Sequence, residues 1–154
     1  MKWYILSKKD LVINMVKIGD YELPDDLFYY EQHTWIKVEG DLVRVGLDKI
    51  GLARAGKIVF IRVKQGKAIP QGKTFGTAEA GKGVVPLYAP VSGDVVETNP
   101  AVDKRNVAAL NEDPYGKGWI IKMKPSNLNG DLKVLKHGAT LTPWAEEEIK
   151  KIKA

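Results

Sequence analysis

The 154-residue chain contains no cysteine, and histidine occurs only at His33 and His137. Without cysteine the protein can form no disulfide, no thiolate nucleophile and no zinc site with cysteine ligands. The two histidines lie far apart in sequence, so no local histidine cluster can bind a metal ion. Nothing in the sequence points to a mixed histidine–carboxylate site, and we therefore predict no metal site.

Long apolar runs are also missing. No segment approaches the length of about 20 apolar residues that a membrane-spanning helix needs. The first ten residues, MKWYILSKKD, hold a short apolar patch followed by charges, without the cleavage site of a secretory signal. We therefore expect no membrane segment and a cytoplasmic protein. A composition of 44% hydrophobic and 28% charged residues is typical of a folded domain.

The chain carries a formal net charge of +5. Such a charge can mark a nucleic-acid partner, but the lysines are scattered between apolar residues and are densest in the C-terminal tail. No basic–aromatic RNA-binding signature or recognition-helix motif is present. We predict no nucleic-acid partner, and a basic nucleic-acid binder remains as a rival hypothesis.

Short strands dominate the predicted secondary structure. Residues 34–38 and 42–47 alternate apolar and polar side chains around a Gly-containing loop, which predicts a hairpin. Pro86 predicts that its strand lies at a sheet edge or ends there. Gly- and Pro-rich turns separate five further predicted strands, at 57–63, 74–79, 84–88, 94–98 and 119–124. The pattern predicts a β sandwich or a partly open barrel.

Short helices are predicted at the edges of the sheets. Asp48 can cap a helix over 48–55, and residues 101–110 read as a second short helix. Thr142 is the predicted N-cap of a C-terminal helix, with Pro143 at its first position. One apolar face of that helix is formed by Ala145, Ile149 and Ile152.

The first 20 residues read as an N-terminal extension, followed by one domain over 21–154. Within the extension, residues 11–18 fit either a strand or an extra helical turn. The sequence does not decide between these two.

Residues 79–90, EAGKGVVPLYAP, place Lys82 between two glycines at the predicted tip of a hairpin. Glycines allow positive φ and leave no neighbouring side chain in the way, and a hairpin tip is highly exposed. A long, flexible primary amine in this position suits covalent attachment of a cofactor arm. Most Gly-Lys-Gly triplets are ordinary turns, and a Schiff-base lysine would need a desolvated pocket that a hairpin tip does not supply.

Residues 89–93, APVSG, follow the lysine and resemble the lipoyl/biotinyl-carrier fold, in which the modified lysine crowns a hairpin. The resemblance implies a mainly β barrel-sandwich hybrid with short flanking helices and a C-terminal helix. Biotin carriers usually have methionines on both sides of the lysine, whereas lipoyl carriers often have a glutamate three residues before it, as Glu79 is here. The resemblance therefore implies lipoate on Lys82, with Glu79 as a recognition contact for the lipoylating enzyme.

Residues 111–119, NEDPYGKGW, closely match "NEDPYGxGW" of the glycine cleavage system H protein family, and 31–40, EQHTWIKVEG, resemble its first hairpin. The resemblance covers about residues 22–150. It implies a monomeric lipoyl carrier, not an enzyme, that shuttles an aminomethyl intermediate. The implied partners are glycine decarboxylase (P protein), aminomethyltransferase (T protein), dihydrolipoyl dehydrogenase (L protein), and a lipoate ligase or lipoyl transferase. His33, Trp35, Trp119 and the turn 113–116 are predicted to be structural.

Two departures from the family pattern leave the pathway open. The family usually reads close to "ESVKAASD" around the lysine and "LPEVG" after the central strand, where this chain has EAGKGVVP at 79–86 and VKQGK at 63–67. These segments resemble H-like lipoate-binding proteins, which imply a sulfur cargo and a heterodisulfide-reductase-like partner complex. A non-lipoylated interaction domain of the same fold is the third alternative.

Overall fold

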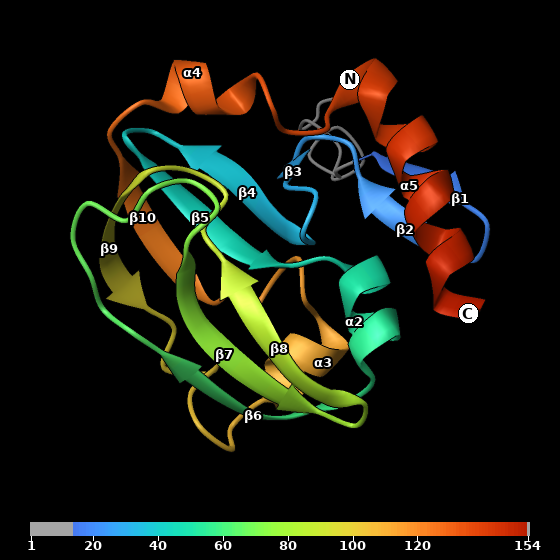
Figure 1. Ribbon diagram of the computed structural model, residues 1–154, viewed down its shortest axis with the longest axis horizontal. Helices are drawn as coiled ribbons and strands as arrows, with labels where there is room; N and C mark the ends of the chain where they lie inside the picture. The colour runs from blue at the N-terminus through green and yellow to red at the C-terminus, as the bar shows by residue number, and fades with distance from the viewer. Residues whose placement is uncertain (1–13, 154) are drawn as a thin grey trace, which may run out of the picture.

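The computed structural model describes residues 14–153, in which two open antiparallel sheets face each other (Figure 1). The larger sheet has the strand order β3-β4-β5-β10-β9 and the smaller one β6-β7-β8. The strands of the larger sheet are β3 (Phe28–Tyr29), β4 (Thr34–Glu39), β5 (Leu42–Leu47), β10 (Ile121–Pro125) and β9 (Gly93–Thr98). Those of the smaller sheet are β6 (Ile58–Val63), β7 (Thr74–Ala80) and β8 (Gly83–Tyr88). The mainly β fold predicted from the alternating pattern is confirmed.

The main hydrophobic core lies between the two sheets. Buried residues alternate along β5 and β10, as the period of two predicts, whereas register shifts in β6 and β7 change the spacing there. The larger sheet contributes Val43, Val45, Ile121 and Met123, and the smaller sheet contributes Ile58, Ile61, Phe75, Ala78 and Leu87, all fully buried. The hairpin predicted over 34–47 forms as β4 and β5, with Glu39 paired to Leu42 around a loop in which Gly40 has φ of +65°.

A second core joins the helices to one end of the sheets, around the fully buried Trp35. It contains α2 (Lys49–Ala55), α5 (Leu141–Lys150), and a hairpin of β1 (Met15–Ile18) and β2 (Tyr21–Pro24). Residues 15–18 are thus a strand, and residues 11–13 lie outside the described part. No helix within residues 14–153 is long and apolar enough to cross a membrane. The remaining helical segments are α3 (Ala108–Glu112), α4 (Leu128–Leu132), η1 (Gly138–Thr140) and η2 (Lys151–Lys153).

The helix predicted over residues 101–110 is wrong over residues 101–107. The helix α3 spans Ala108–Glu112, and the preceding residues form turns. Lys104 exchanges two backbone hydrogen bonds with Ile61 of β6, at 2.9 and 3.0 Å, and its φ is +54°. Pairing with the free edge of β6 therefore takes up the backbone groups that a helix would have used.

The C-terminal helix begins earlier than predicted. Its N-cap is Thr140 rather than Thr142, and Pro143 falls in the first turn instead of at the first position. Proline is tolerated there because the N–H groups of the first turn have no partner within the helix. The predicted face is confirmed, since Ala145, Ile149 and Ile152 all pack into the second core.

Candidate functional site

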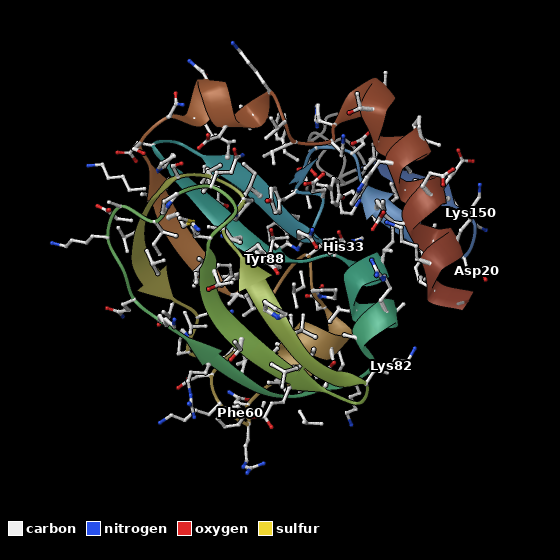
Figure 2. The ribbon with its side chains drawn as sticks, in the orientation of Figure 1. Asp20, His33, Phe60, Lys82, Tyr88 and Lys150 are labelled. Carbon is white, nitrogen blue, oxygen red and sulfur yellow. The ribbon has the colours of Figure 1, made fainter. Side chains whose placement is uncertain are left out.

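Lys82 lies in the two-residue loop between β7 and β8, where Ala80 pairs with Gly83. Its side chain is exposed at the tip of this hairpin (Figure 2). Of the two flanking glycines only Gly83 takes a positive φ, +130°, a conformation that favours glycine. Gly81 does not, and a Cβ added there would come no closer than 3.9 Å to another atom, so nothing in the structure explains a glycine at that position.

The backbone of the hairpin tip is tied to the end of α2. The amide of Lys82 donates to the carbonyl oxygen of Ala55 at 3.0 Å, and that of Gly81 donates to the carbonyl oxygen of Lys57 at 3.1 Å. The chain can turn between these two acceptors because Gly56, the C-cap of α2, has φ of +86°. Lys82 therefore combines a fixed backbone with an exposed side chain.

Side chains of the segment 111–116 bind the backbone at both ends of the stretch that runs from α2 to the start of β6. The side-chain amide of Asn111 both accepts from the backbone N–H of Ile58, at 3.0 Å, and donates to its carbonyl oxygen, at 2.9 Å. The Tyr115 hydroxyl accepts from the backbone N–H of Lys49 at 2.9 Å. These contacts hold both ends of the segment from α2 to β6. The turn 113–116 was predicted to be structural, and the contact of Tyr115 agrees with that prediction, whereas the role of Asn111 was not predicted.

A cleft of about 310 Å³ opens beside Lys82, between β8 and α2. β8 is the outer strand of its sheet, as Pro86 predicted, so one edge of it faces the cleft. His33 and Tyr88 lie toward the end of β8 that is remote from Lys82 (Figure 2). The lining residues are Gln32, His33, Leu47, Gly51, Arg54, Ala55, Lys82, Gly83, Val84, Val85, Pro86 and Tyr88.

Next to the cleft, His33 lies between two buried carboxylates. Its Nδ1 is 3.0 Å from both Asp48 carboxylate oxygens, and its Nε2 is 2.8 Å from Oε1 of Glu148 on α5. Burial alone would lower the pKa of His33, but the Asp48 charge and the hydrogen bonds to Asp48 and Glu148 outweigh burial and raise it. The prediction that His33 is structural therefore needs a refinement, because this buried side chain forms a charged link between α2 and α5.

Arg54 and Glu148 are the residues that sequence reasoning missed. Arg54, in the last turn of α2, lines the cleft and donates through Nη1 to Oε1 of Glu148 at 3.2 Å. Glu148 is only 7% exposed, although its neighbours in sequence suggested an ordinary solvated acidic turn. Its position on the buried face, next to Ala145 and Ile149, is the one signal that could have revealed it.

Two other predicted residues have clear positions. Glu79 is exposed on β7, opposite Val84 in the register, and does not line the cleft. Trp119 is only partly buried. Its ring lies under the Lys122 amine and the Arg44 guanidinium, 5.2 and 5.6 Å from the ring centre. Within residues 14–153 no group of three or more His, Asp or Glu side chains could hold a metal ion.

Two open sheets with an exposed lysine at an anchored hairpin tip define a lipoyl/biotinyl-carrier domain. A model of the family described as "Glycine cleavage H-protein" matches residues 27–148. The chain belongs to this family, whose members are carrier components that bear lipoate. The resemblance stated for the NEDPYG segment is confirmed.

Similar proteins support the same assignment. The chain is 44% identical over 144 residues to "Glycine cleavage system H protein 2" of Aquifex aeolicus (strain VF5), covering 89% of this chain and 84% of that protein. It is 45% identical over 118 residues to "Probable glycine cleavage system H protein 2" of Sulfolobus acidocaldarius, covering 73% and 78%. A crystal structure of a glycine cleavage system H protein from Mycobacterium marinum superposes with a TM-score of 0.64, at 31% identity, over 81% of this chain and 98% of that one.

Proposed function

We propose that the protein is a lipoyl carrier in which lipoate is joined to Nζ of Lys82 by an amide bond. The observation that carries this proposal is the exposed Lys82 side chain on a backbone held by the Ala55 carbonyl. A modifying enzyme can reach such an amine, and the arm formed can move while its base stays fixed. Family membership supports the choice of lipoate.

Bound lipoate and the protein chain would have different roles. The dithiolane of bound lipoate supplies the chemistry of loading, carrying and reoxidation, as in other proteins whose cofactor does the reaction. The chain itself supplies the mounting and the surface on which partner enzymes dock. Tethering raises the concentration of the arm at each docked partner. The cleft beside Lys82 offers the arm a partly apolar resting place, formed in part by Leu47, Ala55 and Val85.

Family membership supports glycine cleavage as the first candidate pathway. The cargo would be an aminomethyl group, received from glycine decarboxylase (P protein) and passed to the aminomethyltransferase (T protein). Dihydrolipoyl dehydrogenase (L protein) would reoxidise the arm, and a lipoate ligase or lipoyl transferase would install it. Glu79, exposed three residues before Lys82, is proposed as a contact for that installing enzyme.

A sulfur cargo, delivered to a heterodisulfide-reductase-like complex, is the second candidate. The observation that favours it is the charge of the cleft, which is lined by Arg54 and by no carboxylate within the described residues. A protonated aminomethyl group would meet a like charge there.

Intact-mass measurement tests the carrier proposal. The purified protein is incubated with a lipoate ligase, ATP and lipoate, and we expect one lipoyl adduct. Lys82→Arg should give none, whereas Lys57→Arg, a matched change at an exposed lysine beside the hairpin, should be modified as in the wild type. No adduct on the wild type, or an adduct that survives Lys82→Arg, would reject the proposal in favour of a non-lipoylated interaction domain.

A further inference from the structure

The smaller sheet turns one face outward, away from the core. The register identifies its residues, because Glu79 of β7 lies between Phe60 of β6 and Val84 of β8. Phe60 is partly buried and Glu79 is exposed, while Val84 is 67% exposed. The next row across the same face is exposed as well and consists of Arg62, Thr77 and Pro86. No other element of residues 14–153 therefore covers this face.

Two arginine side chains lie against the Phe60 ring. Cζ of Arg62, two residues along β6, is 5.6 Å from the ring centre, and Cζ of Arg105 is 5.7 Å from it. Arg105 follows Lys104, whose backbone pairs with that of Ile61 on β6, and this pairing brings the turn beside the ring. Attraction between each guanidinium and the ring holds both cations in place before any partner binds.

The charges of these two arginines are not matched within residues 14–153. The other two arginines of the chain, Arg44 and Arg54, form ion pairs with glutamates. The exposed neighbours Asp103 and Lys104 carry opposite charges and offset each other. Counter-charges for the two arginines beside the ring therefore have to come from outside the described chain.

A protein surface with carboxylates supplies such counter-charges. Arginine and aromatic residues are enriched at the centres of protein interfaces, and a guanidinium binds a carboxylate through two parallel hydrogen bonds. Glu79, the acidic residue of the three strands, gives the face a second sign of charge. A nucleic-acid backbone, which is negative throughout, would be repelled by Glu79, whereas a folded protein can match both signs.

This face leads directly to Lys82. Glu79 is three residues before it along the hairpin, a distance of roughly 10 Å at most. Figure 2 shows Phe60 on the outside of the smaller sheet, on the same side of the molecule as Lys82. Whatever cargo the arm carries, the enzyme that joins lipoate to Lys82 has to approach this hairpin while the amine is still free.

We propose that the arginine face, formed by Phe60, Arg62 and Arg105, is the docking surface for the enzyme that installs the arm. That enzyme presents carboxylates to both arginines, and Phe60 is the positioning residue that holds them. This inference rests on the proposed attachment of lipoate to Lys82 and adds the surface by which the installing enzyme recognises the protein.

Initial rates of lipoylation test the inference. The rates are measured by intact mass over a range of concentrations of the protein, with a lipoate ligase, ATP and lipoate. Arg62→Gln and Arg105→Gln should each raise KM about two- to fivefold, the effect of one exposed charge contact. The value of kcat should stay unchanged, because docking is the same before and during the reaction. Salt should raise KM of the wild type more than that of the double variant.

The matched control is Arg44→Gln. It removes an arginine that also lies against an aromatic ring, at 5.6 Å from the centre of Trp119, but from the larger sheet. Its KM should equal that of the wild type. Phe60→Leu should raise KM, because the arginines lose the ring that holds them, and Phe60→Tyr should keep the wild-type value. The thermal midpoint of each variant verifies that it is folded.

An unchanged KM in the double variant would overturn the inference, as would an equal rise in Arg44→Gln, which would show that net charge alone matters. A random oligonucleotide is the second probe. Binding at low salt that the double variant loses would assign the arginine face to nucleic acid and reject enzyme docking. A wild-type protein that accepts no lipoyl group is recognised by its mass, and that result rejects the carrier function itself. The two failures are thus separate.

Discussion

The backbone amide of Lys82 donates a hydrogen bond to the carbonyl oxygen of Ala55 at 3.0 Å. This bond joins the tip of the β7–β8 hairpin to Ala55, the last residue of α2, and Arg54 directly precedes Ala55 in that helix. The attachment point and the cleft are therefore held in one local unit. An arm joined to Lys82 would have a fixed origin relative to the cleft walls, although the lysine side chain itself is exposed.

The two glycines beside Lys82 should differ in their tolerance of alanine. Gly83→Ala places a Cβ on a residue with φ of +130° and should lower the free energy of unfolding by about 1–3 kcal/mol. Gly81→Ala, the matched control, meets neither a positive φ nor a close contact and should change it by less than about 0.5 kcal/mol. Urea denaturation measures both. Equal losses would mean that the tip conformation does not depend on Gly83.

Glu79→Gln should slow lipoylation without preventing it. Glu79 is exposed near Lys82 and outside the cleft, so its removal takes one charge from the surface that an installing enzyme meets. The expected loss in the initial rate is about two- to fivefold, the size of one exposed charge contact. Intact mass followed over time measures it, with Glu97→Gln on β9 as a control. An unchanged rate would remove Glu79 from the recognition surface.

Much of the fold could be predicted because its signals are local. Alternation over 34–47 specifies the β4–β5 hairpin. Pro86 predicted either a sheet edge or a strand end, since proline cannot donate to a neighbour, and the structure shows the edge. The helix predicted over 101–110 failed for the opposite reason. The backbone of Lys104 pairs with that of Ile61, and this pairing overrides the helical propensity of the segment. A contact between residues so far apart in sequence gives no local signal.

The candidate site also has one part that the sequence predicts and one part that it does not. The exposed position of Lys82 could be predicted because consecutive residues of the sequence form the turn around it. The cleft and its charges could not be predicted, because His33 and Glu148 are 115 positions apart in the sequence and only folding brings them into contact. The burial of Glu148 was also hard to predict, because its sequence neighbours Glu146 and Glu147 are solvent-exposed glutamates.

Asn111→Ala should destabilise the protein while leaving Lys82 available. The Asn111 side chain satisfies both the N–H and the carbonyl of the buried Ile58, and the alanine leaves these groups without partners. Loss of such partly buried hydrogen bonds costs about 1–3 kcal/mol. Chemical denaturation measures the loss, and intact mass should still show complete lipoylation at low temperature. Asn129→Ala, at an exposed position, serves as the control. A stability equal to that of the wild type would contradict the supporting role of Asn111.

Glu148→Gln tests the link between α5 and the cleft. The substitution removes the charge from hydrogen bonds to His33, Arg54 and Lys151 and should lower the free energy of unfolding by about 1.5–3 kcal/mol at pH 6. Glu147→Gln is the matched control, since its ion pair with Lys150 is exposed and should contribute less than about 0.5 kcal/mol. Similar losses in the two variants would show that the buried contacts add no stability beyond a surface pair.

The same link predicts how stability changes with pH. The pKa of His33 is raised above its ordinary 6.5, because Asp48 and Glu148 together outweigh the effect of burial. Its contribution to stability is therefore complete below pH 6.5 and is lost as the pH rises through the raised pKa. The pKa of Glu148 is lowered from 4.5, since hydrogen bonds from Lys151 and His33 outweigh burial, so its contribution is lost only as the pH falls through that lowered value.

The link should thus stabilise the protein most between about pH 4.5 and pH 6.5. His33→Asn is the appropriate variant, because asparagine tolerates the φ of +74° at this position. Urea titrations from pH 5 to pH 9 should show the largest gap between wild type and His33→Asn near pH 6, and the gap should narrow as the pH rises. His137→Asn, which leaves the two carboxylates bound to His33, should keep the wild-type pH profile. A gap that stays constant over this range would show that protonation of His33 does not hold α5 against α2.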